Sequence, residues 1–252
     1  MCTKTLLQTT AFCAALILTA VLFSGCETTD SSAPPSGASP AAPGAAAPSH
    51  FSQEYHADNG RNISIGRATA DNGGWRFKEP HLDKCWIADG FNFTGYDAIY
   101  IAPTVSTAKI HDDETATQEL AKENLVIELK RSLSAKGFFP KVVTEESAIP
   151  ANGRVLRLEN TIVAYTKGGG AARFWVGLYG GGQPMVRVHG ILTDAGKTVF
   201  EFEGTRSGVS AAARMDGAVM KDEDIQLGDI QSLVLDLTDF MAAIAGKYTP
   251  RS

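Results

Sequence analysis

A run of small and turn-forming residues near the N-terminus constrains this chain more than any other feature of its sequence. Every residue from Ser31 to Ser49 is serine, alanine, proline or glycine, and proline occurs five times in this run. Such a segment has little apolar surface to bury and cannot hold a helix. We therefore expect residues 26–50 to be a flexible tether between a short N-terminal segment and a folded part that begins near residue 51.

The segment before this tether has the features of a secretory signal. Residues 11–23 are apolar apart from Thr19, and Lys4 is the only charged residue before Glu27. An apolar core of this length is typical of signal peptides and is short for a membrane span. The alternative is a membrane helix from about Thr5 to Gly25, which at about 20 residues would just cross a bilayer.

The end of this segment predicts how it is processed. The sequence Leu22-Phe23-Ser24-Gly25-Cys26 resembles the bacterial lipobox, in which a diacylglycerol is attached to the cysteine and the chain is cut before it. Residues 1–25 are therefore expected to be a lipoprotein signal peptide, and Cys26 the lipidated residue, with palmitate among its acyl chains. Because Glu27 replaces the aspartate of an inner-membrane retention signal, we expect an outer-membrane anchor with the domain facing the periplasm.

Charge and cysteine content exclude several classes of function. The formal net charge is -5, so the chain lacks the basic excess that drives nucleic-acid binding through counterion release. The four cysteines show none of the paired short spacings of a zinc site. We expect no nucleic-acid partner, no metal and no cofactor. The expected partners are the membrane, through the lipid, and an envelope protein or cell-wall component.

The folded part divides at about residue 95. Residues 51–95 mix glycine, asparagine and aspartate with isolated aromatic residues, without a sustained period. They are predicted to form a loop-rich lead-in that packs across the domain formed by residues 96–252. Cys85, in this lead-in, is expected to be a small buried hydrophobe or a free thiol.

Two helices are predicted in the domain. His111-Asp112-Asp113 is interpreted as a helix start rather than a metal site, and the helix runs to about Lys136 and ends at Gly137. One stripe of it is apolar: Ala121, Leu125, Val126, Leu129 and Leu133. Leu120 and Ile127 lie on the other side, and the lead-in aromatics are expected to cover them. A polar loop over residues 204–228 then leads to a second helix, which begins at Asp229 and ends at Gly246.

The strands are predicted from short apolar runs and from alternation of apolar and polar residues. The predicted strands are residues 98–102, 138–143, 156–162, 186–192 and 199–203. The expected fold is therefore a single α+β domain, with a mainly antiparallel sheet of about five strands and two helices packed on one face.

One hairpin is predicted in detail. Asp194-Ala195-Gly196 is expected to be a three-residue loop with Gly196 left-handed, because an odd loop keeps the apolar residues of both strands on one side. The expected pairs are Arg187 with Glu203, Val188 with Phe202, His189 with Glu201 and Gly190 with Phe200. His189 is thereby predicted to be a charge partner of Glu201 rather than a catalytic base.

Three segments together resemble the bacterial lipoprotein family called domain of unknown function 4410. They are Tyr96–Pro103, the helix end Gly137-Phe138-Phe139, and the segment from Leu156 through Gly168, Arg173, Gly177, Gly180 and Gly182 to Val188. The resemblance covers roughly residues 90–245. It implies a lipid-anchored envelope domain, and it supplies no catalytic residues because the family has no assigned activity.

The glycine-rich segment Gly168–Gln183 is the predicted contact surface. It resembles a phosphate loop only superficially, because it leads into Pro184 and a strand rather than into a helix. It also carries three aromatic residues of the kind that dominate binding surfaces: Phe174, Trp175 and Tyr179. The alternative is that Phe174 and Trp175 fold back into the core.

The predicted function is a non-enzymatic binding or scaffolding module, anchored by lipid in the cell envelope. The chain has no Gly-x-Ser-x-Gly motif, the commonest signal of a serine hydrolase. The alternative is an envelope hydrolase or a small-ligand-binding protein whose site is assembled from distant residues. Such a site would gather at least two of a defined set around one cavity: His111, Asp112, Glu159, His189 and Asp216.

Overall fold

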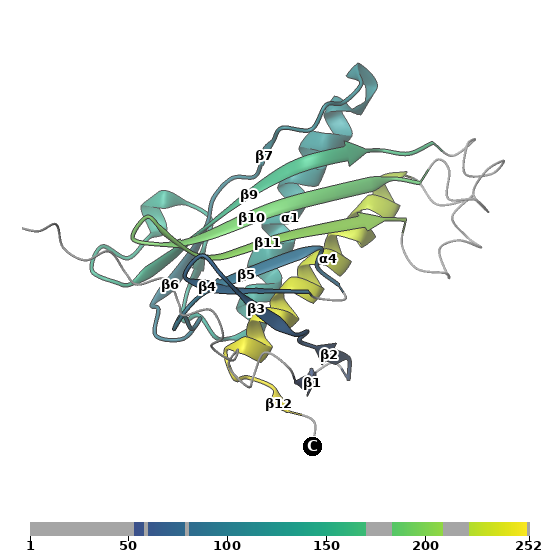
Figure 1. Cartoon of the computed structure of the whole chain (residues 1–252). Coiled ribbons are helices and arrows are strands. Elements are labelled where there is room, and N and C mark those ends of the chain that lie inside the picture. Colours follow the sequence, from purple (N-terminus) through teal and green to yellow (C-terminus); the bar gives the residue numbers. More distant parts are fainter. Residues whose placement is uncertain (1–52, 58–59, 79–80, 170–182, 209–221, 251–252) are drawn as a thin grey trace, which may run out of the picture. The chain divides into compact units, whose positions relative to one another are not determined.

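The computed structural model describes residues 53–57, 60–78, 81–169, 183–208 and 222–250 (Figure 1). All of them belong to the second of two compact units, residues 39–252. The predicted signal peptide, Cys26 and the tether therefore lie outside the described residues. No described helix is both long and apolar enough to cross a membrane.

A large mixed sheet forms the main layer of the domain. Its strand order is β3-β4-β5-β11-β10-β9-β6-β8, and β7 pairs with β9. The strands are β3 (Ala68–Asp71), β4 (Gly74–Phe77), β5 (Lys84–Ala88), β6 (Ala98–Ile101), β7 (Val105–Ser106), β8 (Val142–Val143), β9 (Val155–Thr166), β10 (Met185–Asp194) and β11 (Lys197–Ser207). The pairs β6–β8, β6–β9 and β7–β9 are parallel, and the remaining pairs are antiparallel.

Two long helices pack against this sheet, and a second, smaller sheet lies apart from it in the strand pairing. The helical segments are η2 (Asp112–Glu114), α1 (Thr115–Lys136), η3 (Glu146–Ala148) and α4 (Asp222–Ile244). The small sheet consists of β1 (Glu54–His56), β2 (Asn62–Ser64) and β12 (Thr249–Pro250), in the order β12-β1-β2. The prediction of an α+β fold with two helices is confirmed, whereas the prediction of about five antiparallel strands was wrong.

The predicted lead-in accounts for most of the missing strands. Residues 68–88 contain β3, β4 and β5, which extend the sheet beyond β11. These strands have four or five residues, too few for alternation to stand out from the surrounding turn residues. Their apolar side chains Trp75, Phe77 and Ile87 are buried in the core. The lead-in is therefore part of the sheet and not a loop-rich strap.

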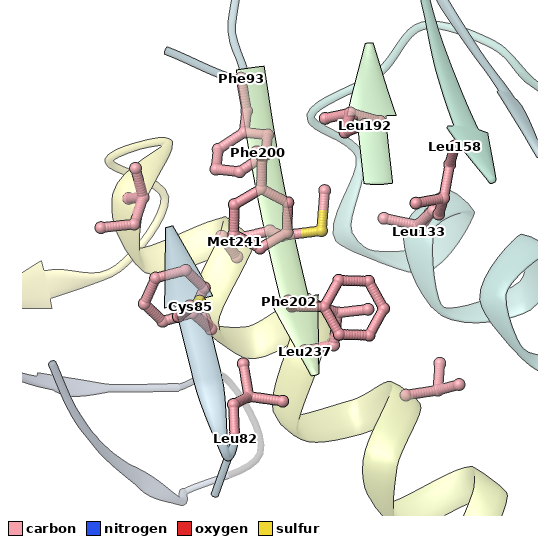
Figure 2. Close-up of a cluster of buried hydrophobic side chains, with 14 of the residues drawn as sticks. Leu82, Cys85, Phe93, Leu133, Leu158, Leu192, Phe200, Phe202, Leu237 and Met241 are labelled. Carbon is pink, nitrogen blue, oxygen red and sulfur yellow. The ribbon is translucent and has the colours of Figure 1, made fainter. Parts of the chain in front are cut away.

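The core lies between the large sheet and the two helices. Figure 2 shows Phe200 and Phe202 of β11 among side chains that come from other strands and from the helices. Phe93 meets Phe200 edge to face with ring centroids 5.4 Å apart, and Cys85 is fully buried nearby. Burial of each large apolar side chain contributes about 1.5–3 kcal/mol, so this layer is the main source of stability.

Helix α1 follows its sequence signals closely. His111 is the N-cap of the short turn that leads into α1, and Gly137 ends α1 in the left-handed conformation, with φ of 62°. The side chains of the predicted apolar stripe that are buried are Ala121, Leu125, Leu129 and Leu133. Leu120 and Ile127, however, are 44% and 58% exposed. The expected cover is missing because the lead-in strands pair with β11, three strands away from β6.

Helix α4 is longer than predicted. It begins at Asp222, so Asp229 is an internal, buried residue rather than the N-cap. The sequence before Gly228 is mostly polar and shows no helical period of apolar residues, so the first turns of the helix were not predicted. Ile225 and Gln226 are nevertheless buried there. The end of the helix agrees with the prediction, because Gly246 has a φ of 73°.

The β10–β11 hairpin differs from its predicted register by two residues. Val188 pairs with Gly204 rather than with Phe202. The loop has two residues, Ala195 and Gly196, and both have positive φ, as in a type I′ turn. A bulge between Leu192 and Thr193 supplies the extra residue that the prediction assigned to the loop. A two-residue loop with a bulge buries the same side chains of both strands as a three-residue loop without one. The alternation of apolar and polar residues therefore did not distinguish the observed register from the predicted one.

The charge pairs predicted across this hairpin do form, but diagonally. His189 Nε2 lies 3.1 Å from Glu201 Oε1, and Arg187 Nε lies 3.8 Å from Glu203 Oε1. The diagonal neighbours of a strand pair are within reach of long side chains. The left-handed conformation predicted for Gly196 is also confirmed, with φ of 83°.

An ionic network joins the small sheet to α4. Asp236 and Asp239 of α4 are almost completely buried. Their side chains contact Arg61, Lys136, Arg206 and Tyr248. Because Arg61 immediately precedes β2, these contacts hold the first strands of the described chain against the helices.

Candidate functional site

A groove beside α1 is lined in part by Ile127, one of the exposed large hydrophobic residues that the structure describes. It has a volume of about 450 Å³ and lies between α1, the connection from β6 to β7, and the residue that follows β8. The residues that define it are Pro103, Thr104, Glu119, Glu123, Val126 and Ile127. We call it the α1 groove.

The local sequence explains why this groove is apolar and open. Pro103 ends β6, and the chain enters β7 with Val105, whose side chain is 56% exposed. Val105, Leu120 and Ile127 are the exposed large hydrophobic residues in the described part of the chain. Ile127 lines the groove, Val105 adjoins its lining residue Thr104, and Leu120 adjoins Glu119 on the helix. Clustered exposed apolar residues are typical of interaction surfaces.

Polar groups at the α1 groove give it a second kind of contact. The Thr104 hydroxyl is buried and has no hydrogen-bond partner among the described residues. Lys122, also in the lining, donates to Glu119 at 2.7 Å and 2.9 Å. Glu123 forms no ion pair with any residue that the structure describes. The groove can therefore accept apolar side chains and offers the unpaired carboxylate of Glu123 at its edge.

A polar cleft of about 370 Å³ lies at the β10–β11 turn. Asp194 accepts hydrogen bonds there from the Tyr96 hydroxyl at 2.8 Å and from Arg154 Nη2 at 3.1 Å. The guanidinium of Arg154 also lies 4.4 Å from the centre of the Tyr96 ring. These three side chains thus satisfy one another.

The electrostatics of this cleft do not favour acid–base chemistry by Tyr96. Burial, together with the hydrogen bond to Asp194, raises the pKa of Tyr96 to about 12. The hydroxyl therefore stays protonated at neutral pH and acts as a donor. The cleft is built as a structural brace between the start of β6 and the hairpin.

The described residues of the predicted enzyme alternative do not gather around one cavity. His111 is part of the helix start, where its backbone N–H donates to Glu114 Oε2 at 3.0 Å, and Asp112 is exposed beside it. Glu159 accepts a hydrogen bond from Arg157 at 2.7 Å, while His189 contacts Glu201. Neither the α1 groove nor the polar cleft is lined by any of these four residues. Asp216 lies outside the described residues.

The described residues also provide no arrangement of three or more His, Cys, Asp or Glu side chains that could hold a metal ion. The predicted contact residues Phe174, Trp175 and Tyr179 lie outside the described residues, as does Cys26. The strand end that leads into their segment is anchored, because Lys167 N–H donates to Glu114 Oε1 at 2.9 Å.

Sequence reasoning missed the α1 groove although part of its signal was present. The helical pattern placed Leu120 and Ile127 opposite the core stripe, but they were assigned to an internal contact. Val105 carried no such signal, since a single valine after a proline does not show whether its strand lies at a sheet edge.

Comparisons with known proteins give one family match. Residues 91–212 match the model of a family described as Domain of unknown function (DUF4410). No curated protein matches the sequence.

Several solved structures are loosely similar. The PelC dodecamer from Paraburkholderia phytofirmans has 14% identity and a TM-score of 0.39, covering 61% of this chain and 94% of that chain. A DUF330 protein from Xanthomonas campestris has 10% identity and a TM-score of 0.37, covering 64% and 91%. A minor lipoprotein from Acinetobacter baumannii has 13% identity and a TM-score of 0.29, covering 62% and 98%. These TM-scores are too low to transfer a role.

Proposed function

Residues 91–212 of this chain belong to the family Domain of unknown function (DUF4410), and from that premise we propose that the protein is a lipid-anchored, non-enzymatic binding module of the cell envelope. The observation that carries the proposal is the α1 groove, which is lined by Val126 and the exposed Ile127, with the exposed Leu120 on the same face of the helix. Its partner is a protein with an apolar segment, because an apolar lining favours such a segment over a hydrophilic cell-wall polymer.

The N-terminal sequence supports the location. In this proposal Cys26 is lipidated and holds the protein at the outer membrane, with the domain in the periplasm. The tether between the lipid and the domain would span about 27 Å as a flexible coil and about 70 Å as a polyproline II helix. The α1 groove could therefore reach a partner embedded in the same membrane or one standing off from it.

The chemistry of the polar groups supports binding over catalysis. Asp194 accepts hydrogen bonds from both Tyr96 and Arg154. Because its pKa is about 12, the Tyr96 hydroxyl is protonated at neutral pH and cannot accept a proton as a base. The α1 groove contains carboxylates but no described histidine or cysteine. A binding role needs only the apolar surface that is already present.

Site-specific photo-cross-linking tests the proposal. A photoreactive residue at Leu120 of the full chain, irradiated in intact cells, is expected to give one discrete protein adduct. Ile127→Lys should reduce the adduct at least fivefold, because it places a charge in the apolar lining. Ala116→Lys, at an exposed position of α1 that does not line the groove, is the control and should leave the adduct unchanged. Equal effects of the two substitutions would contradict the proposal.

A further inference from the structure

We infer that the α1 groove face binds the same face of a second copy of this chain, with the two α1 helices antiparallel about a two-fold axis beside Val126 and Ile127. The inference rests on the proposed function and names the partner within it. A two-fold interface brings one patch against itself, so the patch must be complementary to its own rotated image.

The apolar residues meet this condition at the centre of the face. Val126 and Ile127 are consecutive, and both line the α1 groove. An axis between them would place Val126 opposite Ile127 of the second copy, and the reverse. Four apolar side chains would then meet at the axis, where interfaces are driest and most apolar.

The charged residues meet the same condition on either side. Glu123 and Lys130 are exposed, and neither belongs to any of the ion pairs among the described residues, the nearest of which on α1 are Lys122–Glu119 and Arg131–Glu128. They are seven residues apart, which is about 10 Å along a helix, and at 100° per residue they point within about 20° of each other. With the axis beside Val126 and Ile127, Glu123 faces Lys130 of the second copy, and this pair occurs twice.

The alternative orientation is disfavoured by the same charges. In a parallel pair about a two-fold axis, Glu123 would face Glu123 of the second copy and Lys130 would face Lys130. Like charges placed opposite each other suppress the wrong arrangement. The antiparallel arrangement also places Ser134 of the second copy level with Glu119, so that this exposed small residue leaves room for the neighbouring Leu120.

The size of this face indicates that the lipid anchor matters. Residues 119–134 of α1 cover about 24 Å of helix, and one such helix face is smaller than the ~800 Å² per partner of a standard interface. Pairing in free solution should therefore be weak. Copies held in one membrane plane meet at a much higher effective concentration, which favours a weak pair without new contacts.

Disulfide cross-linking of the full-length, membrane-anchored protein tests the pairing. Ile127→Cys lies beside the axis, so mild oxidation of membranes is expected to convert most of the protein into a covalent homodimer. Ala116→Cys is an equally exposed position of α1, but the two copies of it would be about 30 Å apart. It should give at least fivefold less dimer, and the unsubstituted chain is the background control.

Charge reversal tests the orientation. Glu123→Lys and Lys130→Glu should each reduce the Ile127→Cys dimer at least fivefold, because each creates two like-charge contacts. The double substitution should restore the dimer, since both pairs re-form with reversed sign. These positions are exposed, and thermal melting of each variant distinguishes lost pairing from lost folding.

The outcomes separate this inference from the proposed function. A homodimer with charge rescue supports the antiparallel pair. A homodimer without charge rescue overturns the proposed arrangement. If Ile127→Cys gives no homodimer while the photoreactive residue at Leu120 still labels another protein, the partner is not a second copy but the binding function stands. If neither cross-link forms, both ideas fail.

Discussion

Asp229 shows how one buried carboxylate affects the whole domain. Its side chain is buried inside α4, where it accepts a hydrogen bond from Gly208 N–H at 3.0 Å. Burial raises its pKa from 3.8 to about 6, and the hydrogen bond and nearby Arg206 only partly oppose this. The folded state therefore holds a proton that the unfolded state has already released between these two pH values.

Stability should consequently fall as the pH rises from about 4 to about 6, by on the order of 2 kcal/mol. Asp229→Asn should remove this slope, because the amide oxygen can still accept from Gly208 without a buried charge. At pH 7 the variant should be more stable than the original chain by on the order of 1–2 kcal/mol. Urea unfolding at several pH values measures this, with Asp224→Asn, exposed on the same helix, as control. An unchanged slope in Asp229→Asn would assign the effect to another group.

The ring of Phe202, on the neighbouring strand, leaves no room for a side chain at Gly190. A Cβ atom at this position would lie 2.0 Å from the ring of Phe202, which pairs directly with Gly190 and is itself buried. Gly190→Ala should therefore lower the free energy of unfolding by about 1–3 kcal/mol through overpacking. The double variant Gly190→Ala/Phe202→Leu should lose less than the sum of the single losses, because the smaller side chain leaves room. Additive losses in denaturant unfolding would argue against this contact.

At the scale of elements, the two ends of α1 and its buried stripe behave as local rules predict, whereas its outer face depends on what packs nearby. The strand connection Pro103–Ser106 leaves that face open. The neighbouring glycine-rich segment leaves β9 at a point that is bonded to Glu114.

The glycine-rich segment carries a separate prediction. If Trp175 contacts a partner, Trp175→Ala should change the free energy of unfolding by less than about 0.5 kcal/mol and abolish cross-linking to that partner. Calorimetry and cross-linking of the same preparation measure the two effects. A loss of about 3–5 kcal/mol in stability would instead place the indole in the core and remove it from the contact surface.

For the whole molecule, the link between anchor and domain is as important as either part. The chain enters the domain at the small sheet, which the ionic network ties to α4 through Asp236 and Asp239. Asp239→Ala should cost about 3–5 kcal/mol, because Lys136 would remain buried without this carboxylate. Glu119→Ala, which breaks an exposed pair with Lys122, should cost less than about 1 kcal/mol. Equal losses in chemical unfolding would show that the network does not hold the domain together.

The anchor itself has a direct test. Cys26→Ala is expected to leave the precursor uncleaved, because attachment of the lipid at the sulfur precedes cleavage. Intact-mass measurement should show residues 1–25 retained in the variant and a diacylglycerol on Cys26 in the original chain. An unmodified mature N-terminus at another residue would rule out the lipoprotein assignment.

The features that could be predicted from the sequence depend on near neighbours along the chain. Helix periodicity predicts the buried stripe of α1. Backbone sterics of single residues predict three positions with positive φ: the helix ends at Gly137 and Gly246, and the turn at Gly196. These features involve contacts within a few residues, so local sequence contains the information.

Tertiary structure alone decided the features that join distant segments. The bulge at Leu192 and Thr193 set the hairpin register, since two registers bury the same faces and only packing of Phe202 over Gly190 separates them. Residues 68–88 extend the sheet beyond β11, because β5 pairs with the edge of β11 that β10 does not occupy. Because these strands lie beyond β11, they do not cover Leu120 and Ile127, and the apolar surface beside the α1 groove stays exposed. Which apolar surfaces remain exposed is a property of the completed packing, and no local pattern contains it.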